Sequence, residues 1–351
     1  MSLLTDTSAA IRPLDQAAIE AARARQEQLT KPRGALGRLE TLSIQIAGIT
    51  GVPRPRLTTP AVVVMAADHG IARQGVSAYP TEVTPQMVLN FLAGGAAINV
   101  LARHVGARVV VVDMGVALDL PPHPDLLVRK LAPGTADFTR EPAMSRAQAQ
   151  AALEAGIGVA DSLIDSGVDC LATGDMGIGN TSASSAIVAA ITGRPVAEVT
   201  GRGTGVDDAG LQRKVALIEA ALALHRPEPH DALDVLAKVG GFEIGGLAGV
   251  MLGAAARRVP VVVDGFISGA AALIACSLAP AAQPYLIAAH RSVEQGHQAI
   301  FARLDLEPLF DLGMRLGEGT GAALGLSLCQ AACKVLDEMA TFTEAGVTDR
   351  T

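Results

Sequence analysis

Five short apolar runs, rich in Val, Ile and Ala, recur along the chain, and glycine, proline or acidic residues bound them. They lie at residues 61–70, 107–115, 168–177, 259–266 and 284–290. A continuous apolar run of this length is typical of a strand that is buried on both faces of a sheet. The pattern therefore predicts five buried β-strands.

Segments of helical length separate these runs. They cover residues 85–104, 145–166, 180–192, 206–224 and 244–257. Residues 14–50 also follow a polar helical pattern, which "TKPRGALGRLE" (30–40) interrupts, and we expect residues 291–351 to be helical. Alternating strands and helices favour a mostly parallel sheet with right-handed crossovers. We predict an α/β fold in which helices flank a Rossmann-like, mostly parallel sheet.

The composition adds to this picture in two ways. Half of the residues are hydrophobic, but only 3% are aromatic and none is Trp, so the core has to be built from Ala, Val, Leu and Ile. The formal net charge is −7 and the Lys and Arg residues are scattered, which argues against a nucleic-acid partner.

The cysteines and the apolar segments bear on the compartment. None of the four cysteines forms a CxxC pair: Cys170, Cys276, Cys329 and Cys333. We expect them to be buried, reduced thiols in a cytoplasmic protein. The N-terminus lacks the basic region and apolar core of a signal peptide. We interpret the uncharged stretch 269–289, which two prolines break, as a buried helix and a strand, and so we expect no membrane partner.

Acidic residues followed by glycine end four of the predicted strands. These acids are Asp68, Asp113, Asp175 and Asp264. Ligands of open α/β sheets bind outside the carboxyl ends of the strands. We therefore expect these groups to line one cleft.

Two glycine-rich turns could bind a phosphate. The first, "TGDMGIGNTSASSAI" (173–187), leads from a strand into a helix, and the second, "TGRGTGVDDAGLQRK" (200–214), contains Arg202 and Lys214. Backbone N–H groups at the start of a helix favour anions. A phosphate-bearing ligand is therefore expected.

Two other ligand classes remain as alternatives. Gly177, Gly179 and Ser182, followed by Glu198, approach the dinucleotide fingerprint of dehydrogenases, although its third glycine is Ser here and the strand lies outside an N-terminal βαβ unit. The side chains of His290, Glu294 and His297 have a spacing that would put them on one face of a helix and would permit metal binding. A hydrogen-bonded packing layer is the alternative for these three residues, and we assign no metal.

The stretch "RLGEGTGAALG" (315–325) places Glu318 between two glycines at an expected helix start. Glycine permits a ligand to approach the backbone closely, so this acid is a candidate catalytic group. The alternative is an incidental acid in the first turn of a capped helix.

Several long motifs resemble one known family. They are "TKPRGALGRLE", "AADHGI", "GVSAYPTEVTPQMVLNFLAGGAAINVLAR", "TGDMGIGNTSASSAI", "TGRGTG", "GGFEIGGLAG", "DGFISGAAAL" and "MRLGEGTGAAL". Together they resemble the nicotinate-nucleotide–dimethylbenzimidazole phosphoribosyltransferase family. The resemblance implies transfer of phosphoribose from nicotinate mononucleotide to 5,6-dimethylbenzimidazole, which yields α-ribazole 5′-phosphate and nicotinate during cobalamin synthesis. It also implies a homodimer. Each subunit would have a small helical domain from residues 1–57 and 326–351 and a parallel α/β large domain at 58–325.

The resemblance also implies roles for individual residues. Glu318 would be the general base, and Asp175 stands where the family typically has Glu, so its role is open. Phosphate and ribose would bind at Gly177, Ile178, Gly179, Asn180, Thr181, Gly203, Lys214 and Arg315. The benzimidazole would bind at Ser77, Tyr79, Gln86, Met87, Met176 and Leu316. No metal or organic cofactor is required. A non-catalytic nucleotide-binding or regulatory protein on the same fold is the main alternative, and an NAD-dependent dehydrogenase is the other.

Overall fold

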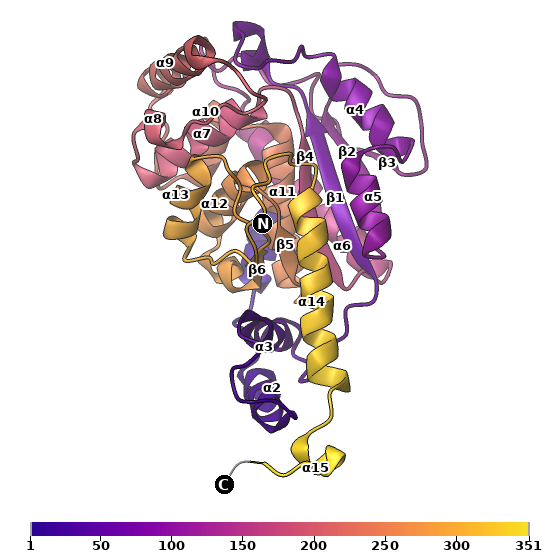
Figure 1. Ribbon diagram of the computed structural model, residues 1–351. Coiled ribbons are helices and arrows are strands. Elements are labelled where there is room, and N and C mark those ends of the chain that lie inside the picture. Colours follow the sequence, from indigo (N-terminus) through magenta and orange to yellow (C-terminus); the bar gives the residue numbers. More distant parts are fainter. Residues whose placement is uncertain (1, 350–351) are drawn as a thin grey trace.

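A six-stranded sheet forms the centre of the protein, which we describe from a computed structural model over residues 2–349 (Figure 1). The strands are β1 (Pro60–Ala67), β2 (Arg108–Gly115), β3 (Leu126–Val128), β4 (Cys170–Met176), β5 (Val261–Val263) and β6 (Leu286–Ala288). Their order is β3-β2-β1-β4-β5-β6, and every neighbouring pair is parallel. This is a strand order of Rossmann-like folds, so the predicted fold class is confirmed.

The side chains of β1 divide between two cores. All eight residues of this strand are buried. Val63 and Met65 contribute to the larger core under α6 (Arg146–Asp165), α11 (Phe242–Ala256) and α12 (Phe266–Leu278), whereas Val62 and Val64 contribute to the core on the other face. Alternation of side chains along a strand produces this division.

The remaining helices either cover the two faces of the sheet or form a helical extension at one end of it. Those of the large part are α1 (Leu3–Ala10), α4 (Val83–Leu92), α5 (Ala97–His104), α7 (Asn180–Thr192), α8 (Val196–Val199), α9 (Asp208–His225), α10 (Ala232–Val239) and α13 (Gly296–Leu304), with 3₁₀ turns at Gly70–Gln74 and Pro280–Tyr285. Those of the extension are α2 (Gln16–Gln28), α3 (Arg38–Thr50), α15 (Phe342–Ala345) and the end of α14 (Thr320–Glu338).

Two helical predictions were wrong. The segment expected to form one helix at 85–104 is two helices, because the chain turns at Gly94, whose φ of 77° is left-handed. By length and composition alone Val83–His104 is long and apolar enough to cross a membrane, but this turn divides it. Residues 291–351 are not helical throughout either, since the stretch between α13 and α14 is irregular.

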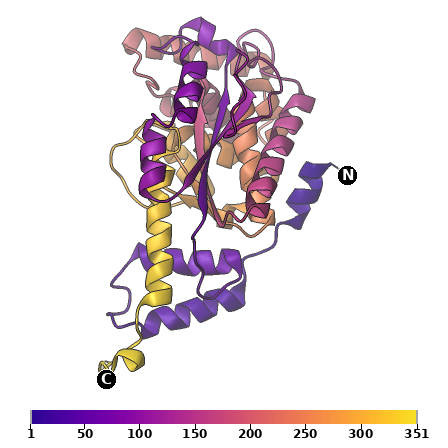
Figure 2. The ribbon, with the colours of Figure 1, turned by 90° about the vertical axis from the view of Figure 1, so that its right-hand side faces the viewer.

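Both ends of the chain build the helical extension at the bottom of Figure 1. Leu29 forms an antiparallel bridge with Thr341, and Arg54 donates from Nε to Asp337 at 2.7 Å. α14 runs without a break past residue 325, where we expected the domain boundary. The first helix, α1, packs on α6 and α11 of the large part, as Figure 2 also shows. The domain bounds stay predictions.

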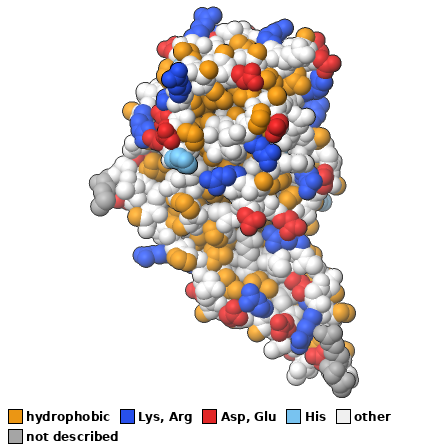
Figure 3. Space-filling model, turned by 90° about the vertical axis from the view of Figure 1, so that its left-hand side faces the viewer, with side chains coloured by type: hydrophobic (Ala, Val, Ile, Leu, Met, Phe, Trp, Pro, Cys, Tyr) orange, Lys and Arg blue, Asp and Glu red, His pale blue; other side chains and the backbone are white. Residues whose placement is uncertain are grey.

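The burial of the cysteines and the distribution of surface charge can be compared with the sequence-based expectations. All four cysteines are free and buried, as expected. On the face drawn in Figure 3, Lys and Arg side chains are scattered among Asp and Glu and do not gather into one basic patch.

Candidate functional site

A cavity of about 660 Å³ lies at the carboxyl ends of the central strands. Its walls come from the segments after β1, β4, β5 and β6, and from the loop before α14. The predicted residues that line it are Tyr79, Met87, Asp175, Met176, Gly177, Ile178, Asn180, Thr181, Gly203, Arg315, Leu316 and Glu318. The cavity therefore lies where ligands of open α/β sheets bind, outside the carboxyl ends of the strands.

Four predicted residues do not line the cavity. Gln86 is exposed, and Ser77 bonds the hydroxyl of the lining residue Thr204 at 2.9 Å. Gly179 has a φ of 98° and is the N-cap of α7, so it shapes the turn. Lys214 is fully buried behind the wall.

The sequence analysis assigned no role in this cavity to several lining residues: Val83, Thr204, Gly265, Phe266, Ile267, His290, Ser292, Glu294 and Gly317. Gly265 to Ile267 follow β5, and His290 to Glu294 follow β6. Position directly after a strand is the sequence signal that these residues share with Asp264.

Glu318 occupies a strained backbone position. Its φ is 63°, and the flanking residues Gly317 and Gly319 have φ values of 80° and 91°. A left-handed conformation at a non-glycine residue costs about 1–3 kcal/mol and persists only where its surroundings fix it. Such strain is typical of functional sites.

The glycines around Glu318 serve a different purpose from the expected one. A Cβ on Gly319 would lie 2.7 Å from the side chain of Val62, and a Cβ on Gly174 would lie 2.6 Å from the carbonyl carbon of Glu318. The glycines therefore let the Glu318 loop pack directly on the sheet. These glycines are therefore explained by the close approach of the loop backbone to the sheet, and not only by the approach of a ligand.

Asp264 fixes this loop from below. Its carboxylate accepts the N–H of Gly319 at 3.1 Å and the N–H of Ala322 at 2.9 Å, which are free donors at the start of α14. The ring of His290 faces the same carboxylate, with 3.6 Å between Nε2 and Oδ1. The side chain of Asp264, which follows β5, thus caps the start of α14, whose N-cap residue is Gly319, and it does not line the cavity.

Two carboxyl groups that line the cavity have raised pKa values. Burial raises the pKa of Asp175 well above its usual range, and the charges of Asp264 and Glu243 add to this effect. Burial also raises the pKa of Glu318, against a hydrogen bond from the N–H of Ile98. Asp175 accepts from Asn180 at 2.9 Å, whereas Oε2 of Glu318 is buried without a partner. Glu318 is therefore a carboxylate still available for a proton.

A lysine supports the glycine-rich turns. Lys214 donates from Nζ to the hydroxyl of Thr181 at 2.8 Å and to the carbonyl of Gly201 at 3.2 Å. Burial lowers the pKa of this lysine to about 8, and the charge of Glu294 opposes the shift. On the other side, Arg315 donates to the carbonyl of Gly203 at 3.0 Å. Two cations thus hold the turn at 201–203.

A buried ion pair supports the turn before α7. Nε2 of His69 and Oε1 of Glu243 lie 2.7 Å apart, and both side chains are fully buried. A Cβ on Gly177 would be 3.3 Å from Nε2 of His69, so the ring lies directly beneath the turn. The pair connects the motifs "AADHGI" and "GGFEIGGLAG".

The expectation that all four strand-end acids line the cleft was wrong for three of them. Asp68 accepts the N–H of Ala117 at 2.7 Å, and Asp113 accepts the N–H groups of Gly115 and Val116. Both acids shape loops, as Asp264 does. Only Asp175 reaches the cavity.

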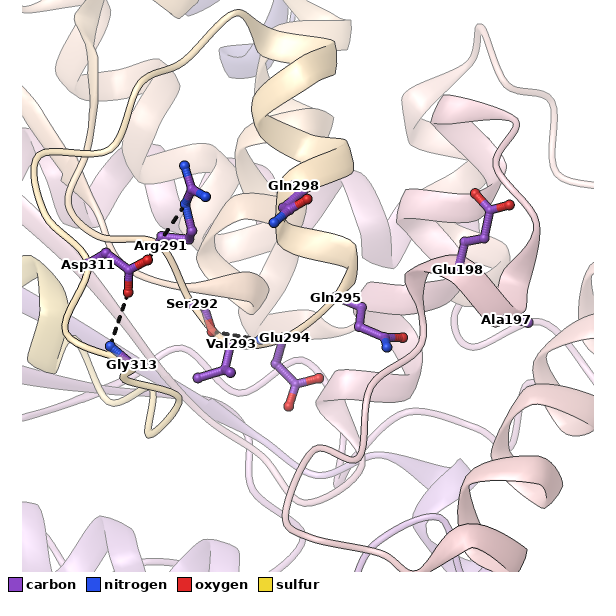
Figure 4. A pocket seen from close by; sticks show the side chains of 10 residues that line it. All are labelled: Ala197, Glu198, Arg291, Ser292, Val293, Glu294, Gln295, Gln298, Asp311 and Gly313. Atoms are coloured by element: carbon purple, nitrogen blue, oxygen red, sulfur yellow. Dashed lines mark hydrogen bonds and ion pairs between the residues drawn. The ribbon is translucent and has the colours of Figure 1, made fainter.

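The structure also bears on the two alternative ligand classes. α13 begins only at Gly296, so His290, Glu294 and His297 do not share a helix face. Within residues 2–349, no group of three or more His, Cys, Asp and Glu side chains could hold a metal. Glu198 lines a neighbouring cavity instead of the central one (Figure 4), which removes the expected ribose contact of a dehydrogenase.

Comparison with known proteins identifies the class of protein. A family model described as phosphoribosyltransferase (DBI_PRT) matches residues 11–347. The chain belongs to this phosphoribosyltransferase family, and the protein is an enzyme of that class.

Individual relatives match the chain over 95% or more of its length. A protein of Roseiflexus sp. strain RS-1 named nicotinate-nucleotide–dimethylbenzimidazole phosphoribosyltransferase is 79% identical over 350 residues, which are 100% of this chain and 99% of the relative. A protein of the same name from Desulforudis audaxviator is 60% identical, over 99% of this chain and 98% of its own. The crystal structure of CobT from Thermus thermophilus matches with a TM-score of 0.92 and 49% identity, over 95% of this chain and 100% of that one. These matches confirm the family resemblance and leave the dehydrogenase and binding-only alternatives without support.

Proposed function

We propose that this enzyme transfers the 5-phosphoribosyl group of nicotinate mononucleotide to 5,6-dimethylbenzimidazole, with Glu318 as the general base. The products are α-ribazole 5′-phosphate and nicotinate. The relatives' names support the substrates, and the observation that carries the base is Glu318 itself. It is held in a strained conformation and carries an unpartnered carboxylate oxygen at the cavity wall.

The chemistry of the two rings explains why one base is enough. The pyridinium of nicotinate mononucleotide is already cationic and leaves as a neutral ring, so no acid has to protonate it. The benzimidazole attacks through one nitrogen and becomes positive, and its other N–H then loses a proton. A carboxylate within hydrogen-bond distance takes this proton and stabilises the positive charge of the transition state. Attack opposite the leaving ring converts a β-glycosidic bond into an α bond.

The raised pKa of Glu318 suits this role. A general base is most effective when its pKa approaches the working pH. Burial moves the pKa of Glu318 in that direction. Asp175 is buried in the cavity wall, and its pKa is raised well above the usual range, so its proton is retained more firmly. We assign to Asp175 the task of holding Asn180.

The two sides of the cavity differ in character, which supports the placement of the substrates. Tyr79, Val83 and Met87 form an apolar wall that suits a flat heterocycle. The turn at 177–181 leads into α7, and the ammonium of Lys214 lies behind Thr181, so the start of a helix and a positive charge favour the phosphate on this side.

We also propose that the protein is a cytoplasmic homodimer without nucleic-acid or membrane partners. Leu89 of α4 and Val100 of α5 are exposed apolar side chains that a second copy would cover. Light scattering during gel filtration would give the mass in solution, and cell fractionation would give the compartment. A monomeric mass would contradict the dimer.

The test of the base is Glu318→Gln. The amide keeps the shape of the side chain but cannot take a proton, so we expect turnover to fall by roughly 10²–10⁴-fold with little change in the Kd of either substrate. Mass spectrometry of the product formed from nicotinate mononucleotide and dimethylbenzimidazole measures the reaction. Glu219→Gln, a change at an exposed residue of α9, is the matched control. Near-normal turnover of Glu318→Gln would refute the assignment.

A further inference from the structure

Three carboxyl side chains line the cavity, and one of them has no assigned partner. These side chains are Asp175, Glu294 and Glu318. Asp175 accepts a hydrogen bond from Asn180, and Glu318 is the proposed base. Neither carboxylate oxygen of Glu294 accepts a hydrogen bond from any residue in the described part of the chain, and Oε2 is buried. Glu294 is the unexplained acid of this cavity.

The loops around Glu294 are shaped to receive it. Its residue is only 8% exposed and follows β6. A Cβ on Gly201 would lie 2.9 Å from Cδ of Glu294 and would overlap Oε2, so the glycine leaves the space that the carboxylate fills. In Figure 4 the side chain of Glu294 extends from the 291–295 segment, while Glu198 stands apart from it and points another way. Glu294 lies where this neighbouring cavity, of about 740 Å³, meets the central one.

A buried carboxylate without a donor is unfavourable until a ligand supplies one. Leaving a buried polar group unpaired costs about 1–3 kcal/mol, and more when the group is charged. The ammonium of Lys214 interacts electrostatically with Glu294, but its hydrogen bonds go to Thr181 and Gly201. A substrate bound in the cavity that Glu294 lines can supply hydrogen-bond donors to it.

The substrates offer few such donors. Nicotinate has none at neutral pH, the phosphate acts mainly as an acceptor, and the N–H of the azole is directed to Glu318. The remaining donors are the two ribose hydroxyls. The ribose lies between the phosphate and the glycosidic bond, and Glu294 shares the cavity wall with the turn at 177–181 and with Glu318.

We propose that Glu294 binds the ribose of the phosphoribosyl group by accepting a hydrogen bond from its 2′- or 3′-hydroxyl. The inference rests on the proposed reaction and assigns the feature of the donor that the enzyme recognises. A site that hydrogen-bonds a substrate hydroxyl discriminates strongly against an analogue that lacks it. Glu294 thus selects a ribosyl over a deoxyribosyl donor.

The test compares nicotinate mononucleotide with its 2′-deoxy and 3′-deoxy analogues. For the wild type and for Glu294→Ala, kcat/KM and the Kd of each donor are measured. The preference for the natural donor is its kcat/KM divided by that of the deoxy analogue. Deoxy donors differ in intrinsic reactivity, but that difference is the same for every variant, so the change in the ratio isolates the contact. A hydrogen bond to a charged group predicts that the preference over one analogue falls by about 10- to 100-fold in Glu294→Ala.

Two further variants separate this contact from a structural role. Glu294→Gln keeps the shape and an acceptor without the charge, so the preference should fall only in part, and this variant carries the test if the alanine variant does not fold. Glu198→Gln changes an exposed acid of the neighbouring cavity and should leave the preference unchanged. A preference that stays within about threefold of the wild type in both Glu294 variants would overturn the proposal, because Glu294 would then act only on Lys214 or on the fold.

Failure of the proposed reaction would look different. Glu318→Gln should lower turnover and keep the preference for the natural donor. If the wild type forms no α-ribazole 5′-phosphate, the reaction assignment fails. The Kd ratios of the three nucleotides would still confirm or overturn the contact with Glu294.

Discussion

Replacement of Asp264 by Asn would test whether the cap of α14 holds the base in place. Asp264 accepts two backbone N–H groups, from Gly319 and Ala322, at 3.1 and 2.9 Å. Asn retains one acceptor oxygen and turns an NH₂ group toward the other donor. A hydrogen bond to a charged group contributes about 1.5–3 kcal/mol, and an unpaired buried donor costs about 1–3 kcal/mol. These two effects overlap, so we expect Asp264→Asn to lower the free energy of unfolding by about 2–4 kcal/mol.

The same change should act on catalysis. The left-handed conformation of Glu318 stores about 1–3 kcal/mol of strain, and a loosened helix start would allow it to relax. A displacement of about 1 Å at a reacting group can lower turnover by about 10²-fold, so we expect kcat to fall by about 10- to 100-fold. The charge of Asp264 also raises the pKa of Glu318 and of Asp175. Without it, the acid limb of the pH–rate profile should move to lower pH.

Urea unfolding and the pH dependence of kcat measure both effects. Asp161→Asn on α6, where the acid is ion-paired at the surface with Arg257, is the control and should stay within about 0.5 kcal/mol of the wild type. The reasoning would be refuted if Asp264→Asn kept wild-type stability and an unchanged acid limb.

Three further predictions follow from the same site. Gly174→Ala would place a Cβ 2.6 Å from the carbonyl carbon of Glu318, so kcat should fall at least about tenfold with a loss of stability of about 1–3 kcal/mol. The control is Gly158→Ala, where a Cβ has no neighbour within 4 Å, and it should be neutral or stabilising in the same unfolding assay. Because burial lowers the pKa of Lys214 to about 8, its ammonium loses a proton as the pH rises through that value, and the KM for nicotinate mononucleotide should then increase; a KM that is flat between about pH 7 and 9.5 would contradict this. Asp175→Glu adds one methylene to a side chain that lines the cavity, so turnover should change by less than about fivefold in the mass-spectrometric assay, and a collapse would show that the shorter acid is matched to its site.

Local pattern was sufficient for most elements of the fold. The apolar run after residue 60 is β1, and the segment 180–192 is α7 with the same bounds, because Gly179 and Gly193 mark its ends. The pattern failed where a strand was only partly buried or where glycine broke a long helical segment. β3 is as short as β5 and β6, but only one of its three residues is buried, so it lacks the continuous apolar run that marked the other two. Gly94 divides the segment 85–104, and periodicity carries no information about a single turn.

Position directly after a strand predicted several residues that line the cavity. Asp175 and the turn at 177–181 were predicted in this way and Glu318 from its glycine frame, and their roles stay predictions. Gln86 and Ser77 do not line the cavity, since their motif gave no information about which side chains face it. Asp264 looked like the other strand-end acids, and only its two bonds to α14 identify it as a cap.

The amino-acid sequence alone determined the alternation of strands and helices, the buried thiols and the family, because these depend on residue type and local order. The packing of distant segments decided the rest. It brought α14 onto β4 so that Glu318 stands over Gly174, placed Lys214 behind Thr181, and left Glu294 without a partner. A carboxyl group acquires a role from its burial and from the donors around it, and both arise only when residues far apart in the chain come together.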